Sequence, residues 1–207
     1  MIKHTPCQVG EFLDISNLRI SATEEYGPEA RIDFERLREF VGSLGNSCVA
    51  KAFCVDTGNA NAFFHYLRRA GYDVEILMPK AMPNGTQKGN VDPLLAFALC
   101  EAVAQYRLRT VVLGSGDVDF TPVVKILRHR KVEVIVIGPS PRHTASELVF
   151  AATRFYTLSD LNLLAVRPRP DHRLGGEAGG ERNEALANPL NGNWARNGAM
   201  AALHQKG

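Results

Sequence analysis

Short apolar runs alternate along the chain with longer stretches in which apolar residues recur every three or four positions. The runs are rich in Val, Ile, Leu and Phe and are bounded by glycine or polar residues, which is typical of buried strands. They predict strands over 9–15, 47–55, 72–78, 110–113, 132–137 and 155–158.

The stretches between these runs have helical spacing, and some carry residues that begin or end helices. Asp33 begins one helical pattern, Gly71 ends another, and Pro122 stands in the first turn of a later one. A short helix is predicted over 146–152, whereas 18–31 is predicted to be a polar loop. Strands that alternate with helices form βαβ units with right-handed crossovers. The pattern therefore predicts an α/β fold with a Rossmann-like, mostly parallel sheet and helices on both faces.

The composition changes at Arg167, after which the chain holds glycine, asparagine, alanine and charged residues but few bulky apolar ones. Such a segment buries too little apolar area to offset the entropy that ordering it costs. We therefore predict an N-terminal extension over 1–8, one domain over 9–166 and a disordered tail over 167–207. The sequence leaves open a homo-oligomer and a protein partner that binds through this tail.

Charge, cysteine content and hydropathy narrow the possible classes of protein only a little. The net charge of +2 neither supports nor excludes a nucleic acid partner. No apolar run approaches the roughly 20 residues that span a bilayer, and the N-terminus lacks the apolar core of a secretion signal. We therefore expect a cytoplasmic protein that binds no membrane. The cysteines, which have no zinc-binding spacing and are expected to be reduced, are Cys7, Cys48, Cys54 and Cys100.

One stretch combines a predicted buried strand with candidate chemistry. The apolar run 110–113 ends in a Gly-Ser-Gly turn, and Asp117 and Asp119 follow before the next helical pattern. Ligands of open α/β sheets bind beyond the carboxyl ends of the strands, so these two carboxylates stand where a site would be. The alternative is that Asp119 only caps the next helix and Asp117 only forms the turn.

Two more acids fall at the same predicted edge of the sheet. Asp14 ends the first strand, with Asn17 three residues later, and Asp92 begins the helix that Asn90 is expected to cap. Each has a structural explanation, because an aspartate favours a helix N-terminus and an asparagine can hold a turn. Together, carboxylates at one edge repel one another unless a cation lies among them. Oxygen ligands favour Mg²⁺ or Mn²⁺ over zinc.

The same edge offers possible contacts for a phosphate. Lys88 precedes Asp92 by four residues, Ser115 lies in the central turn, and Arg142 follows the strand 132–137. Each lysine or arginine could equally be a solvated loop charge. The basic run 128–131 at a helix end is expected to complement the helix dipole and remain in water.

The motifs around these acids resemble the NYN domain. Residues 12–18 are similar to its opening D-x-x-N strand, 88–92 to its K-G-N-V-D element, and 115–120 to its S-G-D-x-D-F signature. The resemblance covers roughly residues 9–163, in the family's order, and is greatest to the LabA-like proteins. Segments similar to the closing helix and strand of the family are 146–148 and 155–158.

The resemblance implies a fold and a chemistry. NYN domains belong with the PIN-like nucleases, which have a Rossmann-like sheet and an acidic pocket that binds Mg²⁺ or Mn²⁺ and cleaves RNA. Asn17 and Ser115 would then orient ligands or contact phosphate, with Lys88 and Arg142 as further substrate contacts. The implied catalytic, metal-binding acids are Asp14, Asp92, Asp117 and Asp119.

Two positions depart from the pattern of many NYN proteins. A further acid often stands six residues after the K-G-N-V-D aspartate, where this chain has Ala98, and another shortly before the closing strand, near Thr153. If the helix directs position 98 at the pocket, Ala98→Asp should tighten metal binding. If Ala98 is core, the same substitution should destabilise the fold.

The sequence therefore favours a metal-dependent endoribonuclease that acts on RNA. The competing interpretation is an RNA-binding or adaptor protein that keeps the fold with a weakened site. A phosphatase or another small-substrate phosphotransferase is a third class, but the chain lacks the extra cap or P-loop that such an enzyme would need.

Overall fold

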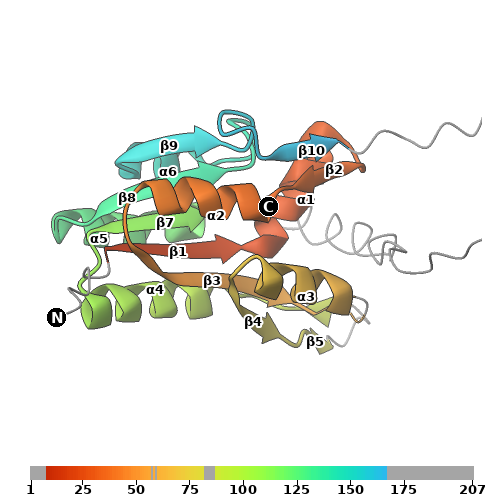
Figure 1. Ribbon diagram of the computed structural model, residues 1–207, viewed down its shortest axis with the longest axis horizontal. Helices are drawn as coiled ribbons and strands as arrows, with labels where there is room; N and C mark the ends of the chain where they lie inside the picture. Colours follow the sequence, from red (N-terminus) through yellow and green to blue (C-terminus); the bar gives the residue numbers. More distant parts are fainter. Residues whose placement is uncertain (1–7, 57, 59, 82–86, 167–207) are drawn as a thin grey trace, which may run out of the picture.

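The computed structural model describes residues 8–56, 58, 60–81 and 87–166 and is built on a six-stranded sheet (Figure 1). All neighbouring strands of this sheet run parallel, in the order β4-β3-β1-β7-β8-β9. This is the Rossmann order, in which the direction of winding reverses between the first strand and the fourth, here β1 and β7. The strands are β1 (Val9–Asp14), β3 (Ser47–Val55), β4 (Asp73–Leu77), β7 (Thr110–Gly114), β8 (Glu133–Gly138) and β9 (Arg154–Thr157).

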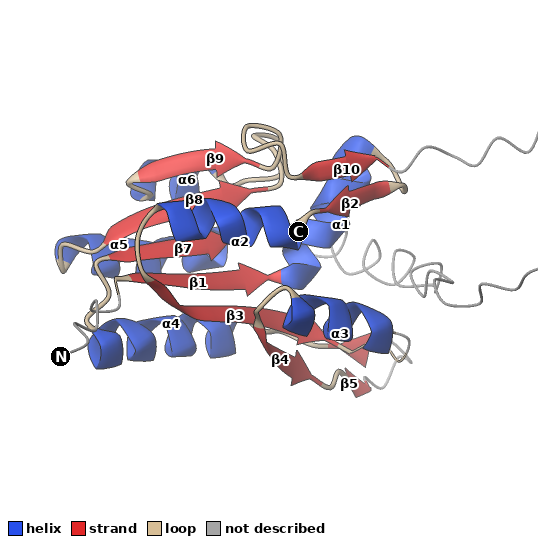
Figure 2. Ribbon diagram, in the orientation of Figure 1, coloured by secondary structure: helices blue, strands red, loops and turns tan. Residues whose placement is uncertain are grey.

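Helices cover both faces of the sheet (Figure 2). On one face lie α1 (Ile15–Tyr26), α2 (Phe34–Ser43) and α3 (Asn61–Arg69). On the other face lie α4 (Asp92–Tyr106), α5 (Thr121–His129) and α6 (Ser146–Ala151). A short 3₁₀ turn, η1 (Val118–Phe120), leads into α5. The predicted α/β class, with a parallel sheet between two helix layers, is confirmed.

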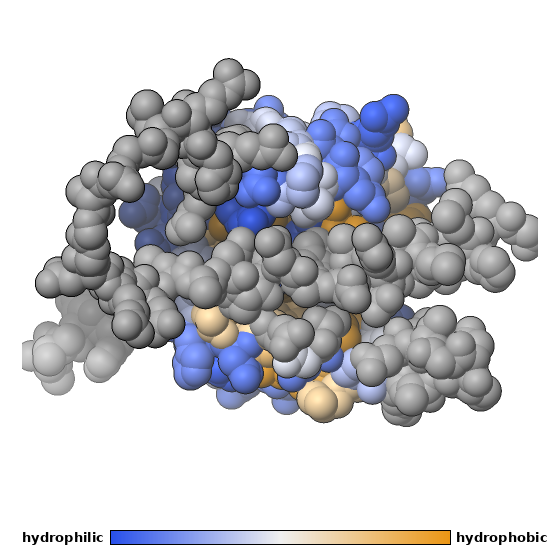
Figure 3. Space-filling model, turned by 90° about the vertical axis from the view of Figure 1, so that its right-hand side faces the viewer, coloured by the Kyte–Doolittle hydropathy of each residue, from blue (hydrophilic) through white to orange (hydrophobic). Residues whose placement is uncertain are grey.

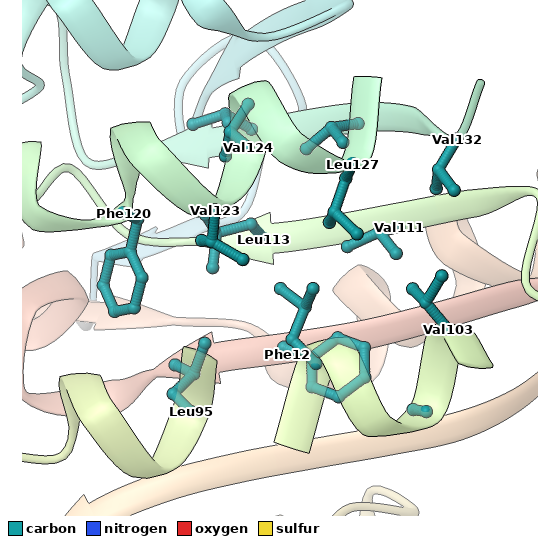
Figure 4. Close-up of a cluster of buried hydrophobic side chains, with 14 of the residues drawn as sticks. Phe12, Leu95, Val103, Val111, Leu113, Phe120, Val123, Val124, Leu127 and Val132 are labelled. Atoms are coloured by element: carbon teal, nitrogen blue, oxygen red, sulfur yellow. The ribbon is translucent and has the colours of Figure 1, made fainter. Parts of the chain in front are cut away.

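Alternation along the strands divides the core into two halves. Phe12 packs with the α4–α6 layer, whereas its neighbour Leu13 packs with the α1–α3 layer. In β7, Val111 and Leu113 face the α4–α6 layer and Val112 faces the other (Figure 4). Because successive strand residues point to opposite faces, a strand buried on both sides is apolar throughout. The uninterrupted apolar runs in the sequence result from this double burial.

The predicted polar loop over 18–31 is wrong. These residues form most of helix α1 and the strand β2 (Ala30–Ile32), which pairs antiparallel with β10 (Leu164–Val166). The helix buries Leu18 and Ala22 and leaves a polar face outside, so its apolar stripe is narrow. Between β4 and α4, the described residues include another short antiparallel pair, β5 (Lys80–Ala81) and β6 (Gln87–Lys88).

The sequence also led to expectations for the cysteines, for membrane-spanning helices and for the domain division. Cys54 and Cys100 are free thiols, as expected, but Cys48 is disulfide-bonded, so the expectation of reduced cysteines is wrong there. Within the described part of the chain, no helix is long and apolar enough to cross a bilayer. Residues 1–7 and the tail 167–207 lie outside the described residues, and the domain division stays a prediction.

Candidate active site

Asp14 stands at the carboxyl end of β1 and is at the same time the N-cap of α1. Its Oδ1 accepts a hydrogen bond from the backbone N–H of Asn17 at 3.1 Å, which satisfies one of the free donors of the helix start. The Ser115 hydroxyl donates to the other oxygen, Oδ2, at 3.5 Å. Only 4% of Asp14 is exposed. Its carboxylate is therefore fixed at the edge where β1 meets β7.

The Gly-Ser-Gly turn after β7 is bonded to the start of α1. The side-chain oxygen of Asn17 accepts from the N–H of Gly116 at 2.8 Å, and the Ser115 hydroxyl accepts from the N–H of Asp117 at 3.2 Å. A Cβ at Gly116 would lie 2.1 Å from the carbonyl oxygen of His143, so close backbone approach requires glycine there. These contacts hold Asp117 in place at the reversal point of the sheet.

Three carboxylates from two separate segments meet beside this turn. Asp92 begins α4, while Asp117 and Asp119 flank the first residue of η1. One oxygen of each lies within 4.8 Å of the other two. The N–H of Asp119 donates to Asp117 at 3.0 Å, and the N–H of Asp92 donates to Asn90 at 2.8 Å. The loops thus fix the backbone and leave carboxylate oxygens free to bind.

Electrostatics couples Asp14 to this cluster. The pKa of Asp14 is raised to about 7, mainly by burial and in part by the nearby charges of Asp92 and Asp117. Burial likewise raises the pKa of Asp92 to about 6, with contributions from Asp117 and Asp119. Both shifts mean that ionised carboxylates are unfavourable here without positive charge. A cation among them would remove this penalty.

The donor set fits a hard divalent cation. Mg²⁺ holds its oxygen ligands at about 2.0–2.1 Å, so two ligand atoms on opposite sides of one ion are about 4.2 Å apart. One oxygen each of Asp92, Asp117 and Asp119 lies within 4.8 Å of the other two, an upper limit not far above this span. No cysteine or histidine belongs to the cluster, which favours Mg²⁺ or Mn²⁺ over zinc.

The purely structural roles considered for Asp117 and Asp119, turn formation and helix capping, are found only in part. Asp117 does form a turn bond and is the N-cap of η1. Asp119 does not cap α5, because the N-cap of that helix is Phe120 and no side chain caps it. Asp119 is exposed beside two other carboxylates, a position that turn formation alone does not require.

The structure places the two predicted basic contacts, Lys88 and Arg142, only by the segments that carry them. Lys88 lies in β6, and its side chain is outside the described part of the structure. Arg142 is exposed in the loop after β8. Ala98 packs against the hydrophobic core of the α4–α6 layer. Thr153 bonds to Val134 near the start of β8, at the edge opposite the acids, because a residue that precedes a parallel strand lies at its amino end.

Two residues beside the cluster carry features that the sequence pattern does not disclose. The buried hydroxyl of Thr121, two residues after Asp119, has no hydrogen-bond partner among the described residues. His143, whose carbonyl touches the central turn, lies 3.2 Å from Glu25 and 3.7 Å from Glu24. The only sequence signal for Thr121 is its place directly after the acidic turn, and for His143 there is none, since its partners are distant in the chain.

Fold and site together define an α/β protein of Rossmann order with an acidic cluster at the carboxyl edge of its sheet. The strand arrowheads in Figure 1 point to that edge, and Figure 3 looks onto it, where both hydrophilic and hydrophobic described residues reach the surface. The NYN domain matches residues 8–160, and the chain belongs to this family. Members of the family are generally nucleases.

A comparison with solved structures supports the fold. A protein of unknown function from Vibrio parahaemolyticus, whose crystal structure is solved, has 24% sequence identity to this chain and a TM-score of 0.67. The alignment covers 80% of this chain and all of that one. No curated protein matches the sequence. The LabA-like branch of the family stays a prediction.

Proposed function

We propose that the protein is a metal-dependent endoribonuclease that hydrolyses phosphodiester bonds of RNA at the acidic edge of its sheet. The observation that carries the proposal is the cluster of Asp92, Asp117 and Asp119 within 4.8 Å, on a family fold that generally serves nucleases. The raised pKa values of Asp14 and Asp92 support it, because burial first and the neighbouring carboxylates second make their ionised forms costly without a cation.

The chain's own acids would hold Mg²⁺ or Mn²⁺. Asp92, Asp117 and Asp119 supply oxygen ligands, and the buried Asp14 supplies a fourth carboxylate behind them. The ion, when bound, makes a coordinated water more acidic and neutralises charge that develops on the phosphate. Asp14 and Asp92 must lose their protons to bind it, so binding is coupled to pH.

The neighbouring polar groups would position substrate and acids. Asn17 and Ser115 already bond to the central turn and to Asp14, so we assign them to orienting these carboxylates and to contacting phosphate. Lys88 and Arg142 would contact phosphates further along the RNA, since Lys88 precedes Asp92 by four residues and Arg142 lies exposed in the loop after β8. The exposed Asp119 leaves the site open to a polymer chain.

Cleavage of mixed labelled RNAs tests this function. We expect wild-type protein to cleave with Mn²⁺ or Mg²⁺ and to stop when EDTA is added. Internal fragments are expected, because an open edge admits RNA away from its ends. EDTA-insensitive cleavage, or release of single nucleotides only, would contradict a metal-dependent endonuclease.

One observation favours a second candidate, an RNA-binding or adaptor protein with a weakened site. Ala98 packs into the core, so the position that is often acidic in relatives supplies no ligand here. An adaptor would bind RNA equally well with or without metal and would cleave none. The same assay with a binding measurement in EDTA separates the two candidates.

The setting of this activity belongs to the proposal as well. We place the protein in the cytoplasm with RNA as its partner and within the LabA-like branch. A homo-oligomer and a protein partner held by the tail 167–207 remain additional candidates, and a measurement of mass in solution tests the first.

A further inference from the structure

A basic hollow lies between the ends of α5 and α6, away from the acidic cluster. It has a volume of about 450 Å³ and is open to solvent. We call it the α5–α6 hollow. The residues that line it are Lys125, Arg128, His129, Lys131, Phe150 and Ala151.

Phe150 is the unusual member of this lining. It lies in the last turn of α6, and 85% of it is exposed, more than any other large apolar side chain of the described residues. A single exposed apolar residue needs no explanation by itself. Here the ring stands among basic side chains, and a flat aromatic surface beside cations is the combination that single-stranded nucleic acid binds.

Arg128 shapes the hollow instead of serving as a free cation. Its guanidinium donates to the carbonyl oxygens of Ala151 at 3.1 Å and Ala152 at 3.3 Å. It thereby fastens the end of α6, and with it Phe150, to α5. Lys125 and Lys131 are exposed, and neither makes an ion pair within the described part of the chain. The charge of Lys131 is therefore available to phosphates, and that of Lys125 also acts on the exposed Glu147 at the start of α6.

The hollow and the candidate active site lie at opposite ends of the same two helices. Helix α5 starts directly after η1, which carries Asp119. Helix α6 starts beside the central turn, where the N–H of Ala145 donates to the carbonyl of Gly116 at 2.9 Å. At 1.5 Å per residue, α5 spans roughly 12 Å from its start to His129. An extended polymer bound at the acids can thus reach the hollow.

We propose that the α5–α6 hollow binds a segment of single-stranded RNA, with one base stacked on Phe150 and phosphates held by Lys125 and Lys131. The proposal rests on the RNA substrate of the proposed function. An acidic cluster repels a polyanion, so cations elsewhere must supply the attraction that holds it. The exposed ring favours a nucleobase over an acidic peptide, which would need the lysines alone.

Binding of a labelled oligouridine, followed by fluorescence polarisation in EDTA, tests this inference without cleavage. We expect Phe150→Ala to weaken binding about tenfold, as removal of one stacking surface does, and Phe150→Tyr to restore it. The double variant Lys125→Ala/Lys131→Ala should lower the slope of log Kd against log salt by roughly 0.7 for each phosphate that it no longer binds. Arg69→Ala, an exposed charge on the other face of the sheet, is the matched control and should change neither.

Several outcomes would overturn the inference, and they differ from failure of the proposed function. Unchanged binding by Phe150→Ala, no binding by the wild type, or an equal decrease in affinity in Arg69→Ala would each do so. Weaker RNA binding by the lysine variant with no effect at Phe150 would point to an acidic-partner surface instead. If the hollow variants lose RNA affinity but wild-type protein never cleaves, the hollow stands and the nuclease function fails.

Discussion

Asp14 links the stability of the metal-free protein to pH. Its folded pKa of about 7 exceeds the ordinary value of 3.8, with burial as the main cause. Between those values the folded protein holds a proton that the unfolded chain has released. Stability therefore falls as pH rises from about 4 to about 7 and then levels off.

We predict that metal-free wild-type protein unfolds more easily at about pH 8 than at about pH 5. The loss of unfolding free energy due to Asp14 is about 3 kcal/mol between these two pH values, since about two pKa units lie between pH 5 and its folded pKa of about 7, each worth about 1.4 kcal/mol. Asn at position 14 can still cap α1, but Asp14→Asn removes the pH dependence that Asp14 causes. The pH dependence that Asp92 causes remains. Chemical denaturation in EDTA at both pH values measures it. Identical pH dependence in both proteins would contradict the assignment.

Glu11 is a second buried acid, and its role is structural. It is fully buried in β1, accepts from the Tyr72 hydroxyl at 2.8 Å and forms an ion pair with Arg38 of α2. Burial raises its pKa, and Arg38 opposes that shift. The role of Glu11 cannot be predicted from the sequence pattern, because nothing around a glutamate in an apolar strand indicates which distant residues it will contact.

We predict that Arg38→Met destabilises the protein by about 3–5 kcal/mol, since it leaves a buried carboxylate without its cation. The double variant Glu11→Gln/Arg38→Met should recover much of the stability. Urea unfolding of both measures the difference. A double variant no more stable than the single one would show that the pair is not the cause.

At the scale of elements, the sequence predicts the strands well and the helices unevenly. The strands of the main sheet can be recognised from the sequence because both of their faces are buried. Helix α1 cannot be recognised in this way, because its apolar stripe is narrow and its start coincides with the end of β1 at Asp14. The acids could be placed together from sequence because parallel strands share one carboxyl edge. The position of Ala98 around α4 could not be, since it depends on how that helix rotates against the core.

We predict that Ala98→Asp destabilises the protein by about 1–3 kcal/mol, because Ala98 packs against the hydrophobic core and a carboxylate there would be desolvated. Affinity for Mn²⁺ should stay unchanged in the folded fraction. Calorimetric titration with Mn²⁺ beside thermal unfolding measures both. Tighter Mn²⁺ binding would show that position 98 reaches the pocket.

At the scale of the whole molecule, the pairing of strands that are distant in the chain cannot be predicted from the sequence pattern. The β2–β10 pair joins residues more than a hundred positions apart, and Asp33 donates its N–H to the carbonyl of Leu163 at 2.8 Å. Such short edge strands have no periodicity to detect. They fasten the end of the domain to its first half.

We predict that a chain ending at Val166 keeps the stability of the full-length protein. A change beyond the few degrees that about 1 kcal/mol produces in a domain of this size would show that the tail packs. A second truncation, ending at Asp160, removes β10 and the buried Leu163 and should melt lower. Thermal unfolding of all three proteins measures the comparison.

The charge of Asp117 carries the central claim of a metal-dependent active site. Asn is nearly isosteric with Asp, and its side-chain oxygen can still accept the 3.0 Å bond from Asp119. Removal of one like charge from the cluster should relieve repulsion in the metal-free protein. Asp117→Asn should therefore be as stable as the wild type, or more stable, without metal.

The most direct test is the rate of RNA cleavage by wild type and Asp117→Asn as Mn²⁺ is titrated, with the stability gained from Mn²⁺ recorded for both. We predict Mn²⁺-dependent cleavage and stabilisation in the wild type and a steep decrease of both in the variant. A variant that cleaves RNA like the wild type, or a wild type without any Mn²⁺ response, would contradict the assignment of this cluster as a metal-dependent nuclease site.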